Sequence, residues 1–355
     1  GLITKQITIK LEKAGTLPDK IGSTKKKQIT NLKIIGEING TDLRMIREMA
    51  GRDVNGRGTD GMLSVLDLSD AKIVEGGDYY YFNGHSDYYI LTGHNDCFTS
   101  NDKIGDSAFE SCSGLTSITL PSGVTEIGKF AFLHCSGLTS ITLPSGLTEI
   151  SSSAFKSCSG LTSLTLPSGL TEIGYSAFKS CSGLTSLTLP SGLTEISSSA
   201  FSGCSGLTSI TLPSGVTMIY SSAFESCSGL TSIALPSGLT EIGVNAFSGC
   251  SGLTSIYVYA EKLPNMGSDV FDGCDAKKCT VYVPKGTYDD YWLSEFGYFE
   301  NIVEFEPTGI NNVITSNDAK VLSRYSLNGQ RLSAPTKGLN IVKYSDGSVK
   351  KVAVQ

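Results

Sequence analysis

Hydrophobic and polar positions repeat along the middle of the chain with a fixed period of 23 residues. Seven cysteines mark this period, at Cys112, Cys135, Cys158, Cys181, Cys204, Cys227 and Cys250. Between consecutive cysteines the order of apolar, hydroxyl and turn residues is nearly unchanged. A constant period of this length predicts a solenoid, because one unit cannot bury its apolar side alone and must stack on its neighbours.

The repeat between Cys112 and Phe132 shows how each rung is expected to fold. Leu115, Ile118 and Leu120 follow an L-x-x-L-x-L spacing. Ile118 and Leu120 lie two apart, so both side chains point to one side of a strand and the intervening hydroxyl residues point outward. The following Pro-Ser-Gly ends the strand, since proline has no N–H to donate, and predicts a tight turn.

The other inward positions also keep one residue type from rung to rung. The segment from Val124 to Ile127 predicts a second, short strand on the far side of the coil. Adjacent rungs should lie about 4.8 Å apart, the spacing of paired strands. A stacked phenylalanine spine is therefore expected from Phe132, Phe155, Phe178, Phe201, Phe224 and Phe247.

The repeated cysteines have two interpretations. They are either buried thiols, or they form disulfides or a ladder of metal ligands. Equivalent cysteines of stacked rungs point the same way, which does not suit the dihedral angle of a disulfide. Zinc sites use closely spaced pairs such as C-x-x-C, and the sequence has none. We favour buried thiols, with Cys274 and Cys279 as the pair to form a disulfide if one exists.

The chain is expected to be mostly β and to divide into four segments. These are an N-terminal strand and helix cap at 1–61, irregular rungs with a Tyr-rich insertion at 62–108, regular repeats and a C-terminal cap at 109–306, and a small antiparallel β-domain at 307–355. In the last segment, Asn328-Gly329 is a strong hairpin signal.

A helix is expected to close the open end of the solenoid. Thr41 would serve as its N-cap, and the helix would run to Met49. Leu43, Ile46 and Met49 share one helical face, which would pack on the first rung.

Two groups of tyrosines interrupt the regular pattern, and they are the candidate ligand-binding residues. Alternation leaves about half of the first group outside, and exposed tyrosines commonly anchor recognition surfaces. The alternative is that these aromatics cover the edge of the first rungs. The candidates are Tyr79, Tyr80, Tyr81, Tyr88, Tyr89, Tyr257 and Tyr259.

Composition excludes several classes of function. The net charge is −6, which does not indicate nucleic-acid binding. No apolar run approaches the roughly 20 residues that span a membrane. The sequence has no G-x-S-x-G, H-E-x-x-H or P-loop, so no catalytic residue, enzyme activity or cofactor is predicted. His85 and His94 each stand in a G-H-x-D context, but we expect plain surface there and no metal site.

The repeat pattern resembles the BspA type of leucine-rich repeat, also called the Treponema pallidum type. The resemblance covers residues 109–283, where Leu120-Pro121, Ala131-Phe132 and Cys135 all stand in register. The tail YSLNGQRLSAPTKGLNIVK is similar to C-terminal sorting domains of surface proteins in anaerobic Gram-negative bacteria. The resemblance implies an exported protein, at the cell surface or outer membrane or extracellular, that takes part in adhesion.

Two functions follow from this resemblance as expectations. The first is an adhesin-like binding protein, expected to be a monomer, that engages a host or bacterial protein or glycan partner. The second is a passive structural spacer without a specific ligand. The regular strands present only Ser and Thr outward, so a binding site is expected near the ends, at Tyr79–Tyr89 or at Tyr257 and Tyr259.

Overall fold

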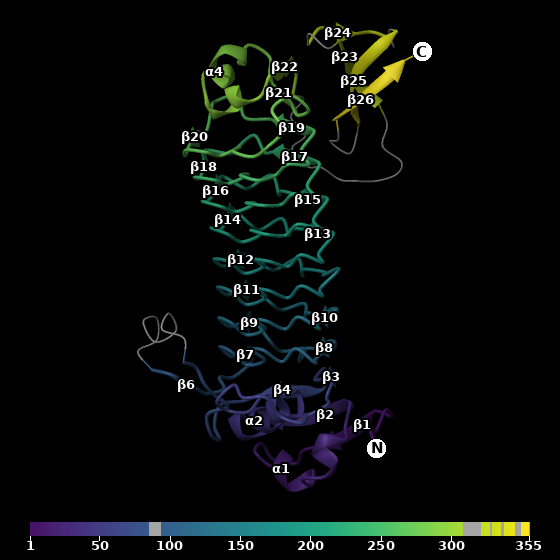
Figure 1. The fold of residues 1–355 in the computed structure, drawn as a ribbon, viewed down its shortest axis with the longest axis vertical. Helices are drawn as coiled ribbons and strands as arrows, with labels where there is room; N and C mark the ends of the chain where they lie inside the picture. Colours follow the sequence, from purple (N-terminus) through teal and green to yellow (C-terminus); the bar gives the residue numbers. More distant parts are fainter. Residues whose placement is uncertain (85–93, 308–320, 327–328, 335–336, 345–348, 355) are drawn as a thin grey trace. The chain divides into compact units, whose positions relative to one another are not determined.

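The computed structural model describes residues 1–84, 94–307, 321–326, 329–334, 337–344 and 349–354. They form two compact units. The first comprises Gly1–Thr185 with Ala200–Ser205, and the second comprises Ser186–Ser199 with Gly206–Gln355. Within each unit the chain winds in rungs whose short strands pair in parallel, so the predicted β-solenoid is confirmed (Figure 1).

In the first unit, one side of the rungs forms a parallel sheet in the order β1-β2-β3-β8-β10. Leu32, Leu66, Ile118 and Ile141 align in this sheet as one buried column. The irregular rung at 62–70 therefore joins the same sheet as the regular repeats. The strands are β1 Ile7–Lys10, β2 Asn31–Ile38, β3 Val65–Asp67, β8 Ser117–Thr119 and β10 Ser140–Thr142, and β4 Ala71–Ile73 pairs with the second half of β2.

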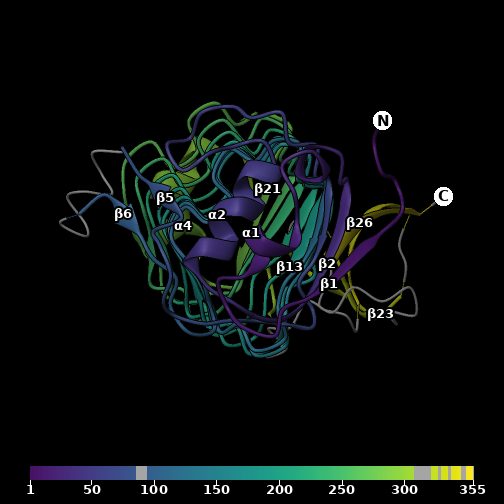
Figure 2. The same ribbon diagram turned by 90° about the horizontal axis from the view of Figure 1, so that it is seen from below.

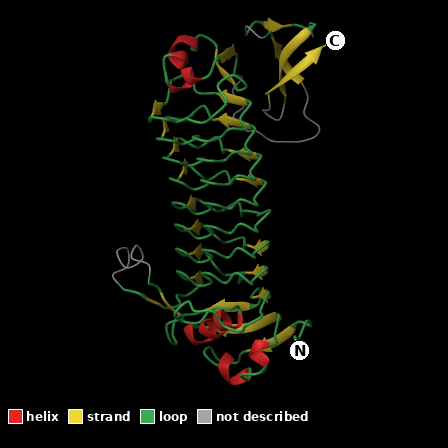
Figure 3. Ribbon diagram, viewed as in Figure 1, coloured by secondary structure: helices red, strands yellow, loops and turns green. Residues whose placement is uncertain are grey.

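The opposite side of these rungs carries the predicted second strand in a shorter form. Each strand has only two residues, an outward charged residue and a buried isoleucine. Figure 3 shows how little of each rung is strand. The strands are β7 Lys103–Ile104, β9 Glu126–Ile127, β11 Glu149–Ile150 and β12 Glu172–Ile173.

The segment that leads into each cysteine holds the rungs together without forming a strand. The amide of Ser111 donates to the carbonyl of Leu133 at 2.7 Å, and that of His134 donates to Lys156 at 2.9 Å. Ser111 and His134 both adopt φ of 60°. Histidine is among the residues that tolerate this left-handed region, which explains why His134 can stand where other rungs carry Ser or Gly.

The predicted phenylalanine spine is confirmed. In the first unit, neighbouring rings from Phe109 to Phe201 stack with centroids 5.1–5.6 Å apart. In the second unit, Phe224 stacks on Phe247 at 5.3 Å, and Phe271 continues the stack. The cysteines are buried thiols beside this spine, as the spacing predicts, and Cys135 Sγ donates to the Phe109 carbonyl at 3.0 Å.

Helix α2, Gly40–Met49, closes the end of the first unit with its buried face (Figure 2). Leu43, Ile46 and Met49 are buried, as predicted. The predicted N-cap was wrong, because Asn39 caps the helix and forms a capping box with Asp42. The short helices α1 Leu17–Lys20 and η1 Lys25–Lys27 precede it.

The second unit continues with the same two kinds of strand. On one side lie β13 Ser186–Thr188, β15 Ser209–Thr211, β17 Ser232–Leu235, β19 Ser255–Val258, β21 Thr280–Pro284 and β22 Asn301–Phe305. On the other lie β14 Glu195–Ile196, β16 Met218–Ile219, β18 Glu241–Ile242 and β20 Asn265–Met266. Helices α4 Tyr288–Trp292 and η2 Glu295–Tyr298 connect β21 to β22, which is the predicted strand–helix–strand cap.

The described residues of the tail form an antiparallel sheet in the order β24-β23-β25-β26. This sheet shares a hydrophobic core with the last rungs, in which Tyr325, Ile341 and Val349 meet Tyr257 and Tyr282. The pairing of Tyr325 with Arg331 agrees with the predicted hairpin, although Asn328 itself lies outside the described residues. The strands are β23 Val321–Tyr325, β24 Arg331–Leu332, β25 Gly338–Tyr344 and β26 Val349–Val354.

Candidate functional site

The first group of candidate tyrosines belongs to the first unit. Tyr79–Tyr81 lead into a hairpin between β5 Tyr81–Phe82 and β6 Asp96–Cys97. Tyr88 and Tyr89, like His85, lie outside the described residues.

Two of these tyrosines, Tyr80 and Tyr81, are buried. The Tyr80 hydroxyl donates to the carbonyl of Asp106, which ties the segment to the first rungs. The guanidinium of Arg47 lies 4.2 Å from the ring centroid of Tyr81. Burial raises the pKa of Tyr81 to about 12. Both rings therefore pack in the interior, because Arg47 of α2 covers one and the rungs cover the other.

Tyr79 is half-buried, and two phenylalanines near it are the more exposed aromatic residues among those that the structure describes here. The Arg44 guanidinium lies 4.5 Å from the Tyr79 ring centroid, and Phe98 meets the same ring edge-on at 6.2 Å. Phe82 and Phe98 are 44% and 53% exposed. Among the described residues of this segment, the exposed aromatic side chains are thus phenylalanines, which were not among the candidate residues.

The polar residues of this hairpin do not assemble a metal site in the part of the chain that the structure describes. His94 Nδ1 lies 3.1 Å from the carbonyl of Asp96. Among the described residues, no group of three or more His, Cys, Asp or Glu side chains could hold a metal ion.

Tyr257 and Tyr259 belong to the second unit and lie beneath the C-terminal sheet. The Tyr257 hydroxyl donates to the carbonyl of Val349 on β26, and its ring stacks on Tyr282 with centroids 4.8 Å apart. Tyr259 meets Phe305 edge-on at 5.6 Å. Tyr257 is 8% exposed and Tyr259 is 4% exposed. Whether any of the candidate tyrosines contacts a partner stays a prediction.

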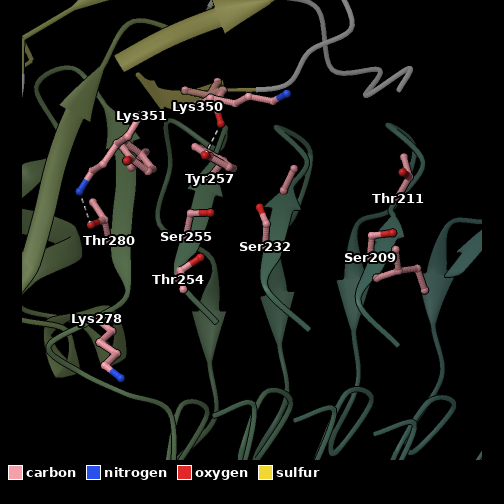
Figure 4. Close-up of a pocket in the computed structure, with 14 residues that line it drawn as sticks. Ser209, Thr211, Ser232, Thr254, Ser255, Tyr257, Lys278, Thr280, Lys350 and Lys351 are labelled. Carbon is pink, nitrogen blue, oxygen red and sulfur yellow. Dashed lines mark hydrogen bonds between the residues drawn. The ribbon is translucent and has the colours of Figure 1, made fainter. Parts of the chain in front are cut away.

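A groove of about 610 Å³ lies next to Tyr257 in the second unit. Strands β15, β17, β19 and β21 form its floor, and the start of β26 forms its wall (Figure 4). We call it the C-terminal groove. Six serine and threonine side chains line the floor beside apolar and aromatic residues, namely Ser209, Thr211, Ser232, Thr254, Ser255 and Thr280.

Three lysines line the C-terminal groove, and the sequence analysis missed all of them. Lys278 stands two residues before β21, while Lys350 and Lys351 belong to β26. Lys351 Nζ donates to Thr280 Oγ1 at 2.9 Å across a separation of 71 residues. The adjacent lysines in the VKKVAV strand were a weak signal, because sequence alone did not indicate which surface this strand would cover.

One family of known proteins matches more than half of the chain. The sequence model described as BspA type Leucine rich repeat region matches six copies, over residues 96–196 and 171–291. A comparison with curated proteins finds no match. Among the described residues, no helix has both the length and the hydropathy to cross a membrane.

Several solved structures are similar to parts of the chain. A leucine-rich repeat protein of Treponema pallidum is 39% identical over 42% of this chain and 69% of its own, with a TM-score of 0.40. A leucine rich cell surface protein of Faecalibacterium prausnitzii is 39% identical over 47% of this chain and 45% of its own, with a TM-score of 0.44. A leucine-rich repeat protein of Bacteroides ovatus is 28% identical over 58% of this chain and 65% of its own, with a TM-score of 0.36. The match thus spans less than two thirds of the latter two chains.

Proposed function

The chain belongs to the BspA-type leucine-rich repeat family, and we propose on this basis that it is a cell-surface or secreted binding protein with an adhesin-like role. Solenoids of this family are typically binding scaffolds rather than enzymes. The proposal therefore assigns the protein a partner and no reaction. The similarity of the tail to sorting domains supports export, as a further part of the proposal.

The observation that carries the proposal is the C-terminal groove. Ligand sites are usually concave and range from about 300 to 1,000 Å³, and the groove, at about 610 Å³, falls within that range. Its floor consists of side chains held on hydrogen-bonded strands, so their positions are set before any partner arrives. Preorganisation of this kind reduces the entropy cost of binding.

A specific observation also supports the alternative, a passive spacer. In the repeats outside the groove, the outward strand positions carry Ser and Thr with little variation, as at Ser117, Thr119, Ser140 and Thr142. Such a surface offers few anchors for a partner. The two functions differ in whether the groove binds anything.

The test is a binding screen of the whole chain against matrix proteins and glycans by biolayer interferometry. Ser232→Trp, on β17, should fill the groove and raise the Kd of a true partner by roughly tenfold or more. Ser140→Trp is the matched control, because Ser140 occupies the same repeat position on β10, is exposed and does not line the groove. The control should shift Kd by at most about twofold.

Two results would overturn the proposal. If no member of the panel binds the chain, the passive spacer becomes the better account. If a partner binds both variants as tightly as the unmodified chain, binding occurs elsewhere and the groove is not the site.

A further inference from the structure

We propose that the C-terminal groove binds an acidic polysaccharide, one that carries carboxylate or sulfate groups along its chain. This inference rests on the proposed binding function and adds the chemical class of the ligand. It is argued from the charge of the groove, the arrangement of its hydroxyl groups and the pairing of its strands.

The charge of the groove is opposite to that of the chain. The chain has a net charge of −6, whereas the groove is lined by Lys278, Lys350 and Lys351. None of the described residues that line it is acidic. A concave surface of one sign raises the local concentration of ligands of the opposite sign. The groove therefore favours an anion.

The placement of the lysines suits a ligand with several separate charges. Figure 4 shows Lys278 and Lys351 on opposite sides of Thr280, with Lys350 directed away from both. Lys351 Nζ is held 2.9 Å from Thr280 Oγ1, and Lys350 Nζ lies 5.4 Å from the ring centroid of Tyr344. The ammonium groups do not converge on one point, as they would around a single small anion. A polymer with anionic groups at intervals can meet them one after another.

The hydroxyl groups of the floor form a row that crosses the strands. Ser232 on β17 pairs with Ser255 on β19, which pairs with Thr280 on β21. Ser209 on β15 occupies the same repeat position one rung earlier. Because paired strands lie about 4.8 Å apart, an extended ligand that crosses the rungs meets equivalent hydroxyls at Ser209, Ser232 and Ser255. Thr280, at the end of the row, is buried, and its Oγ1 accepts hydrogen bonds from Asn301 Nδ2 and Lys351 Nζ. A hydroxyl both donates and accepts hydrogen bonds, which matches the hydroxyl groups of a sugar.

The floor of the groove is less suited to an acidic peptide. Extended peptides commonly bind by adding a strand to an exposed sheet edge, through backbone hydrogen bonds. Strands β19 and β21 each already pair with a neighbour on both sides, so this part of the floor offers side chains and no such edge. The rings of Tyr257 and Tyr282 are only 8% and 1% exposed, so they offer little surface to a peptide anchor residue.

The experiment measures binding of the whole chain to four polymers. Polygalacturonate and dextran sulfate are the acidic probes and distinguish carboxylate from sulfate. Methyl-esterified polygalacturonate and dextran have matching backbones without the charges. We expect an acidic probe to bind, its neutral counterpart to bind at least roughly tenfold more weakly, and affinity to fall as salt rises.

The variant Lys278→Gln with Lys351→Gln tests the site. It should raise the Kd of the acidic probe by roughly tenfold or more, since hydrogen bonds to charged groups are the strong ones. Lys262→Gln with Lys277→Gln is the matched control, because it removes the same charge at exposed positions that do not line the groove. An equal loss in both variants would mean non-specific attraction and would overturn the inference.

Two further outcomes separate this inference from the proposed function. If poly-L-glutamate binds as tightly as the acidic glycans and is equally sensitive to Lys278→Gln with Lys351→Gln, the groove selects charge on a peptide, and the polysaccharide assignment fails. If no polyanion binds but Ser232→Trp weakens another partner, the ligand class is wrong while the groove remains the binding site. If neither polyanions nor any other partner depends on the groove, both proposals fail.

Discussion

Phe178→Ala should be among the most destabilising single changes in the first unit. Phe178 is fully buried, and its ring stacks between Phe155 at 5.3 Å and Phe201 at 5.6 Å, nearly parallel to both. Truncation removes the ring from between two neighbours that belong to adjacent rungs. The rungs cannot close the space easily, because each is held by backbone hydrogen bonds to the next, such as Phe178 N–H to the Ala200 carbonyl.

The expected loss is about 3–5 kcal/mol in the free energy of unfolding, the range for buried Phe→Ala. Stacking accounts for part of this loss, at about 0.5–1.5 kcal/mol for each aromatic pair beyond area burial. Such a loss is a large share of the roughly 5–15 kcal/mol that stabilises an ordinary domain. The stability of a repeat array depends on contacts between neighbouring repeats, so the first unit of the variant should unfold at a lower urea concentration than that of the unmodified chain.

Urea-induced unfolding followed by circular dichroism measures this loss. Tyr175→Ala is the matched control, because Tyr175 lies in the same repeat and is 55% exposed. The control should change stability by no more than about 0.5 kcal/mol. A loss below about 1 kcal/mol for Phe178→Ala, with an unchanged dependence on urea, would show that the spine does not hold the rungs together as argued.

Three further predictions concern the thiols, the carboxylate of Glu149 and the helix cap. Burial raises the pKa of Cys204 to about 12, so its thiol stays protonated and the native protein should resist alkylation by iodoacetamide. After unfolding without reductant, mass spectrometry should show that all ten cysteines are alkylated. The Glu149 pKa is raised above its ordinary 4.5 by partial burial and then by Glu126 and Glu172. Ionisation of Glu149 therefore costs stability, and Glu149→Gln should stabilise the protein at pH 7. This gain should vanish as the pH falls towards the ordinary pKa of a glutamate, where the carboxyl group becomes protonated. No gain at pH 7 in urea unfolding would contradict the prediction. Asn39→Ala should lower stability by about 1 kcal/mol in the same assay, and an unchanged midpoint would argue against the cap.

Much of the fold could be predicted because the repeat carries its own register. Equal spacing places each residue beside its counterpart 23 positions later, as in the pairing of Ile118 with Ile141. The rungs, the phenylalanine spine and the buried cysteines follow from that single rule. The family was expected from the resemblance of the repeat motif, and the match to the BspA-type repeat confirms it. The left-handed residues before each cysteine could not be predicted, because serine at that position is typical of many turns.

The candidate site was harder to predict because it depends on contacts between distant segments. Alternation along the chain did not reveal that Arg47 of α2 covers the ring of Tyr81. The groove was missed for the same reason, since Lys351 reaches Thr280 from 71 positions away. A binding site was expected at either end of the array, near Tyr79–Tyr89 or near Tyr257 and Tyr259, and the groove lies beside Tyr257.

The C-terminal groove lies where one position of the repeat changes its residue. On successive strands this position holds Thr211, Ala234, Tyr257 and Tyr282. The change from small side chains to tyrosines gives strands β19 and β21 an aromatic surface, and the C-terminal sheet packs on it through Val349. That packing places the lysines of β26 over rungs that still present hydroxyl groups. The regular repeats thus supply an even, preorganised floor. Tyr257 and Tyr282 depart from the repeat and pack against the C-terminal sheet, whose strand β26 forms the wall of the groove.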